Sequence, residues 1–114
     1  MSKRRNKNIA RLSEVIKALA NEHRLRIYVR LIQCCPAGTR CQVEGRFTRC
    51  VSELGKDLGI VPSTLSHHVK GLRQAGLVHT ERRGQKIECW VDTKVLAELS
   101  EFFSELNGLE PEDK

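Results

Sequence analysis

The chain has 114 residues, of which 39% are hydrophobic, and a formal net charge of +6 at pH 7. This length supports one small domain with a modest core, so a second subunit is expected to complete it. No apolar run approaches the ~20 residues of a membrane span. The basic N-terminus also lacks the apolar core of a secretion signal, which indicates a cytoplasmic protein.

Charge is unevenly placed along the chain. The first eleven residues hold five cations and no acid, whereas the last fourteen hold five acids and one lysine. A basic body with an acidic end predicts a polyanionic partner for one face only. We expect a flexible basic tail at 1–8, one domain at 9–107 and an acidic tail at 108–114.

Two amphipathic helices are predicted at the start of the domain. Apolar residues recur at helical spacing from Ile9 to Leu19, and again from Glu22 to a point before Pro36. Asn21 separates the two runs and is suited to cap the second helix.

Residues 51–75 predict a helix-turn-helix. Two short amphipathic runs meet at a break marked by Gly59, and Pro62 suits the first turn of the second run. Val61 is a poor cap, so a cap at Ser63, which would start the helix a turn later, is an alternative. The second helix of such a unit enters the DNA major groove, although a helical hairpin without a DNA role has the same pattern.

The outer face of that second helix favours DNA binding. It carries hydroxyls, an imidazole and cations, with almost no acid as far as Thr80. Such groups reach base edges and phosphates. The residues expected near base edges are Ser63, Thr64, Ser66 and His67, and those expected on phosphates are Lys70 and Arg73.

A β-hairpin is predicted over residues 77–92. Two runs with β character bracket Arg82-Arg83-Gly84-Gln85, and Lys86 opens the second run. The basic tip suits a wing on phosphates or in a minor groove, with Arg82, Arg83 and Lys86 as contacts; a solubilising turn is the alternative. Alternation places Cys89 on the core side.

The last predicted helix, 93–107, carries more apolar surface than a small core requires. The residues expected to pair with a symmetry mate are Leu99, Phe102, Phe103 and Leu106. A homodimer through this helix, with the first helix as support, is therefore predicted.

These elements predict a mainly α fold with a β-hairpin wing: a dimeric winged helix-turn-helix of about five helices and a two-stranded wing. Over about 9–106 the chain resembles the ArsR/SmtB family of winged-helix metal-responsive repressors. The segments that carry this resemblance are LSEVIKALANEHRLRIYVRL, STLSHHVKGLRQAGLV and RRGQKIECWVD. The resemblance implies a homodimer that binds an inverted-repeat operator in double-stranded DNA and leaves it when a soft metal or metalloid binds.

The sensing residues of that family transfer only in part. Arsenic and cadmium sensors of the family that this chain resembles carry a Cys-Val-Cys motif. Here Cys50 matches the first thiol of that motif, while Ser52 replaces the second. Zinc sensors use Asp and His on the last helix. Asp92 matches one of these ligands, but Lys94 stands where the His should be, so a zinc site there is not favoured.

The loop at 34–50 offers a different metal site, made of Cys34, Cys35, Cys41 and Cys50. A small hairpin is predicted between Val43 and Phe47 in the same loop. Thiolate-only sites suit soft ions. We therefore expect As(III), or another soft ion, to act as inducer on three of these thiolates, with no organic cofactor.

Two other readings of the sequence remain. The same cysteines suit a thiol redox or persulfide sensor on this scaffold, or a zinc-stabilised interaction module. An enzyme is not expected, because the chain lacks a CxxC motif, a phosphate-cradling glycine loop and a Ser, His and acid set.

Overall fold

The chain opens with two helices, α1 (Lys3–Leu19) and α2 (Glu22–Cys34), in the computed structural model, which describes residues 3–34, 40–42, 45 and 48–109. The Asn21 side chain accepts a hydrogen bond of 3.0 Å from the Arg24 N–H, which confirms the predicted cap of α2. The predicted boundary between tail and helix is wrong, because α1 already begins at Lys3. Residues 3–8 hold no apolar side chain and so gave no periodic signal.

The helix-turn-helix consists of α3 (Thr48–Leu58) and α4 (Pro62–Gln74). Gly59 joins them with a φ of +70°, a conformation that side chains with a Cβ rarely adopt, which confirms the predicted break. Apolar side chains of α3 and α4 pack with those of α1 and α2 in one core. The core holds the outward face of α4 in a fixed position.

The wing is a three-stranded antiparallel sheet in the order β1-β3-β2, formed by β1 (Cys41–Gln42), β2 (Val78–Arg83) and β3 (Lys86–Val91). The expected two-stranded wing is therefore incomplete. The loop between α2 and α3 adds β1, in which Cys41 pairs with Cys89 of β3. The hairpin predicted between Val43 and Phe47 lies outside the described residues.

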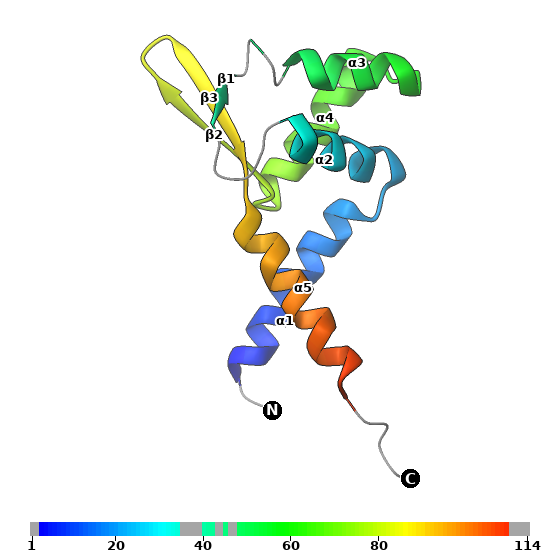
Figure 1. Ribbon diagram of the computed structural model, residues 1–114, viewed down its shortest axis with the longest axis vertical. Coiled ribbons are helices and arrows are strands. Elements are labelled where there is room, and N and C mark those ends of the chain that lie inside the picture. The colour runs from blue at the N-terminus through cyan, green and yellow to red at the C-terminus, as the bar shows by residue number, and fades with distance from the viewer. Residues whose placement is uncertain (1–2, 35–39, 43–44, 46–47, 110–114) are drawn as a thin grey trace.

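The chain ends with α5 (Thr93–Asn107), which matches the predicted bounds. In Figure 1, α5 runs away from the wing beside α1, toward the end of the molecule where both termini lie. An ion pair between Arg11 of α1 and Glu98 of α5 joins the two helices. The molecule is elongated, at 57 × 33 × 20 Å, with the wing and the α1–α5 pair at opposite ends. No helix of the described part is long and apolar enough to span a membrane.

Candidate nucleic-acid interface and thiol pair

The outward face of α4 forms a polar ridge. Leu65, His68 and Leu72 are buried on the opposite face, which fixes the rotation of the helix about its axis. The α4 residues predicted to contact DNA are all exposed: Ser63, Thr64, Ser66, His67, Lys70 and Arg73. Since α4 contains no acidic residue, the ridge presents only donors, hydroxyls and positive charge.

The start of α4 is settled by its backbone. Val61 is the N-cap residue without a side-chain cap, and the Leu65 N–H donates to the Val61 carbonyl over 3.0 Å. The helix is thus formed from Pro62, and the alternative cap at Ser63 is wrong. Ser63 and Thr64 therefore lie in the first turn, where backbone N–H groups lack helical acceptors.

The tip of the wing is basic. Arg82 and Arg83 are the last two residues of β2 and are exposed, and Gly84 makes the turn with a φ of +63°. The Nε of Arg83 lies 3.4 Å from a carboxylate oxygen of Glu88, which offsets part of its charge. Lys86 opens β3, but its side chain lies outside the described part of the chain.

Hollows flank the ridge on both sides. The hollow toward the wing has a volume of about 720 Å³ and lies among α3, α4, β2 and β3, with Lys56, Lys70 and Arg73 as its cations. The other lies among α1, α2 and α4 and has a volume of about 410 Å³. Apart from these cations, the first hollow is lined largely by apolar side chains, among them Val51, Leu65 and Val69.

Two of the predicted sulfur ligands come together in the structure. Cys34, the last residue of α2, is joined by a disulfide to Cys50 in the first turn of α3, with the Cα atoms 6.7 Å apart. Cys41 is instead buried in β1, and Cys35 lies outside the described residues. Among the described residues, no group of three or more His, Cys, Asp or Glu side chains is placed to hold a metal ion.

Cys89 is a core residue, as its strand alternation predicts. Its side chain has no exposed surface, and its thiol donates to the Cys41 carbonyl over 3.4 Å. The two buried thiols thus belong to the pairing of β1 with β3.

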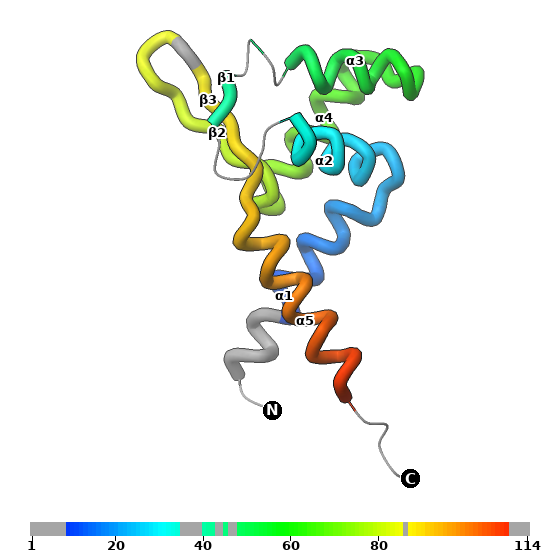
Figure 2. Tube along the Cα trace, viewed as in Figure 1, coloured from blue at the N-terminus to red at the C-terminus, as the bar shows by residue number. Residues whose placement is uncertain are grey.

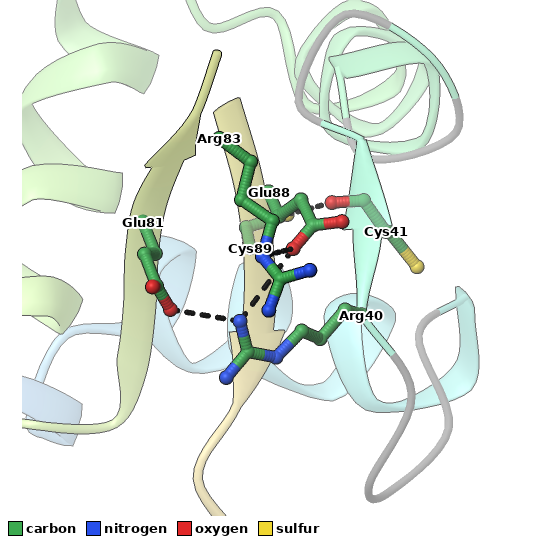
Figure 3. A network of polar contacts seen from close by, with 6 residues as sticks. All are labelled: Arg40, Cys41, Glu81, Arg83, Glu88 and Cys89. Carbon is green, nitrogen blue, oxygen red and sulfur yellow. Dashed lines mark hydrogen bonds and ion pairs between the residues drawn. The ribbon is translucent and has the colours of Figure 1, made fainter. Parts of the chain in front are cut away.

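A polar network around Arg40 holds the segment between α2 and α3 against the wing (Figure 3). One guanidinium nitrogen of Arg40 lies 2.8 Å from Glu81 of β2 and 3.5 Å from Glu88 of β3. The guanidinium also lies 4.1 Å from the ring centroid of Trp90. The contacts of Arg40 with Glu81, Glu88 and Trp90 were not predicted, because these partners are remote in sequence and no local pattern pointed to them.

The base of the wing is joined to α5 through Asp92. Its carboxylate caps α5 by accepting from the N–H groups of Lys94 and Val95, and it lies 2.6 Å from His79 of β2. Burial alone would raise the pKa of Asp92, but the hydrogen bonds from His79, Lys94 and Val95 outweigh it and lower the pKa. Asp92 therefore has a structural role in this chain.

The apolar face of α5 is divided between the core and solvent. Leu99 is 6% exposed and belongs to the core of the single chain, so the structure leaves it little surface for a partner. Phe102 is half-buried, whereas Phe103 and Leu106 are 51% and 45% exposed. Ile9 of the neighbouring helix α1 is exposed as well.

Comparison with known proteins identifies the family of the chain. The model of the bacterial regulatory protein ArsR family matches residues 45–80, from before α3 to β2. HlyU from Vibrio cholerae is 31% identical, with a TM-score of 0.54 over 93% of this chain and 97% of that one. The chain belongs to the ArsR family. This ArsR-family protein is thus a winged helix-turn-helix transcriptional regulator, in a family that is not one of enzymes.

More distant structures share the fold. An ArsR-like regulator from Rhodococcus sp. RHA1 is 20% identical, with a TM-score of 0.60 over 87% of this chain and 81% of that one. A homodimeric winged helix-turn-helix DNA-binding domain from Mycobacterium bovis is 22% identical, with a TM-score of 0.55 over 100% and 95% of the two chains. No curated protein sequence matches this ArsR-family chain significantly.

Proposed function

We propose that this regulator is a repressor that binds operator DNA through α4 and the wing. The observation that carries the proposal is the exposed, acid-free ridge of α4, set beside a basic wing tip. Side chains of the ridge reach base edges in the major groove, while Arg82 and Arg83 contact phosphates or the minor groove. Binding through phosphates makes the affinity fall steeply as salt is added.

The second part of the proposal is a homodimer with an inverted-repeat operator. The exposed apolar side chains of α5 and α1 supply surface that dimer formation would remove from water. One relative of the same fold is described as homodimeric. A two-fold dimer presents two recognition helices to half-sites about one helical turn apart.

The third part is the switch, in which a soft ion, As(III) first, binds thiolates at the junction of α2 and α3. Cys34 and Cys50 lie close enough to share one ion, and their backbones belong to different helices. The third thiolate is drawn from Cys35 or Cys41; the burial of Cys41 in β1 favours Cys35. An ion there would fix the angle between α2 and the helix on which α4 rests.

A redox switch is the second candidate function, and the same pair favours it. A peroxide would take two electrons from the thiols of Cys34 and Cys50, forming one S–S bond and releasing water. No third ligand is needed, since the two cysteines already form a disulfide in the structure. The difference between the candidates is whether an oxidant is required.

A DNA-release titration separates the two. Fully reduced protein is bound to a fluorescent duplex selected from a random-sequence library, and As(III), Sb(III), Cd(II), Cu(I), Zn(II) or hydrogen peroxide is added. Release by As(III) with an excess of a monothiol reductant supports the metalloid sensor. Release by peroxide alone supports the redox sensor, and stoichiometric zinc in the purified protein would favour a zinc-stabilised module.

A further inference from the structure

The hollow on the side of α4 away from the wing contains cations that the helix-turn-helix does not supply. Lys17 comes from α1 and Arg24 from α2, and they face His67 and Lys70 of α4 across about 410 Å³. Glu14 is the acidic residue of this lining and lies 3.6 Å from Lys17. The hollow is therefore positively charged and joins three helices.

Arg24 is held in this place from several sides. Its Nη1 donates to the Ala18 carbonyl at the end of α1 over 3.3 Å, and its backbone N–H is bound by Asn21. Its guanidinium lies flat against α4 where Gly71 has no side chain: a Cβ on Gly71 would be 3.0 Å from the Arg24 Cζ. Its Nε is buried without a hydrogen-bond partner among the described residues. The charge is thus fixed beside the recognition helix.

This hollow lies beside α4 where a DNA backbone would run if α4 lay in a major groove. A helix in the major groove has the phosphates of one strand on each side of it. The hollow toward the wing, with Lys56 and Arg73, lies on one side of the α4 ridge. The hollow with Lys17 and Arg24 lies on the other, and Lys70 lines both.

We propose that Lys17 and Arg24 form a second backbone-phosphate site, on the flank of α4 opposite the wing. The inference rests on the proposed function and adds α1 and α2 to the DNA interface. Lys17 contacts the phosphate directly, whereas Arg24 lends a fixed charge through the wall of the hollow. Glu14 reduces the local charge and so limits how tightly all sequences are bound.

The test uses three variants within the hollow, titrated with the selected duplex and with an unrelated duplex over a series of salt concentrations. Lys17→Ala should weaken binding to both duplexes alike and lower the salt slope by about one unit. Glu14→Gln should strengthen binding to both. Gly71→Ala changes no charge but pushes the Arg24 guanidinium aside by a few tenths of an ångström, so it should weaken binding to both duplexes slightly although alanine favours the helix.

Arg26→Ala is the matched control. Arg26 also lies on α2, is exposed and pairs with Glu22 over 3.0 Å, but it does not line this hollow. Its loss should leave the affinity and the salt slope unchanged. An equal loss in Arg26→Ala and Lys17→Ala would overturn the site in favour of a general effect of net charge.

The Arg82→Ala, Arg83→Ala double variant separates this inference from the proposed function. A lowered slope in the wing variant, together with parental behaviour of Lys17→Ala and Gly71→Ala, would overturn the second site and leave the proposed function in place. Parent protein without salt-dependent binding to any selected duplex would overturn both. A lowered slope in both the wing variant and Lys17→Ala supports both.

Discussion

Single cysteines in this chain differ in what surrounds their sulfur atoms. Cys34 and Cys50 lie at a junction between helices, where both are partly accessible. Cys41 and Cys89 are buried in the sheet, away from solvent. Because reaction with ions or oxidants requires access to the sulfur, these positions should differ in their response to an inducer.

We expect Cys34→Ser and Cys50→Ser each to abolish inducer-driven DNA release while keeping the affinity for DNA. Each substitution removes one of the three thiolates proposed for the ion site and one of the two thiols of the disulfide. Cys89→Ser should still respond, because serine can donate to the Cys41 carbonyl in place of the thiol. Fluorescence anisotropy of the labelled duplex measures both properties.

Cys41→Ser is the sharper control for the ion site. Its burial predicts that release persists, as in Cys89→Ser. A parental response from both Cys34→Ser and Cys50→Ser would show that the junction is not the sensor.

His68 links stability to pH. Burial is the main cause that lowers the pKa of His68, and the positive charges of Arg24, His23 and His67 lower this pKa further. A histidine with a lowered pKa in the folded state binds fewer protons there than in the unfolded chain. The contribution of His68 to stability is therefore fully present above the unfolded pKa of about 6.5, and it is lost as the pH falls from that value through the lower pKa of the folded state.

We predict that the urea concentration at the unfolding midpoint of the parent decreases as the pH is lowered from about 7.5 to about 5.5, an interval that spans the ordinary histidine pKa. His68→Gln, which cannot be protonated, should show a flatter dependence over the same interval. His67→Gln is the control, since His67 is exposed on the ridge. Equal slopes for the parent and His68→Gln would show that His68 does not cause the dependence.

Among the elements, α5 has two tasks that lie at different positions along it. Val95 and Leu99 are buried in the core of the chain, while Phe103 and Leu106 remain exposed one and two turns later. A charge at Leu99 would therefore damage the fold of the single chain. A test of the dimer must use the exposed positions.

We predict that Phe103→Glu with Leu106→Glu gives a folded monomer. Two charges in an apolar seam lose their hydration without gaining partners, a cost that a small interface does not offset. Light scattering at several protein concentrations measures the mass, and circular dichroism checks the fold. Ser104→Glu, exposed on the same helix, should remain dimeric; a dimeric double variant would place the interface elsewhere.

The sequence was most informative where structure is local. The start of α5 at Thr93 and the break at Gly59 follow from caps, glycine and helical periodicity within a few residues. The exposed residues of α4 follow from the same periodicity. These features depend on neighbours along the chain, so one sequence is enough to locate them.

Features that join distant segments were missed or incomplete. Arg24 beneath Gly71 and Arg40 on Trp90 require the fold to bring them together. The strand β1 has only two residues, too few for an alternating pattern, and forms because β3 offers it an edge. Cys34 and Cys50 were grouped by proximity in the sequence, which did not distinguish them from Cys41.

At the scale of the whole molecule, one stretch of chain connects the thiol pair to the wing and to the first helix of the helix-turn-helix. It leaves α2 at Cys34, adds β1 to the wing and enters α3 at Cys50, as the tube in Figure 2 follows. The ends of this stretch are held at the junction of α2 and α3, and β1 is held to the wing by Arg40. A change in geometry at the thiol pair therefore acts on α3 directly and on the wing through β1.

This connection predicts that Arg40→Ala weakens the coupling between inducer and DNA. Coupling of about 1–3 kcal/mol changes DNA affinity about 5- to 150-fold, and by linkage bound DNA must weaken the inducer by the same factor. Without Arg40, the ion pairs to Glu81 and Glu88 and the contact with Trp90 are lost. The pairing of β1 with β3 is then the remaining connection, so a shift of β1 should move the wing less. We expect inducer affinity in free protein to stay near the parental value while both coupling factors shrink together.

Titrating inducer with and without DNA, and DNA with and without inducer, gives the two factors, and Arg26→Ala should keep them at the parental value. If Arg40→Ala keeps the full factor in both directions, the wing is not part of the transmission, and the junction of α2 and α3 acts on α4 through the packing of α3 alone.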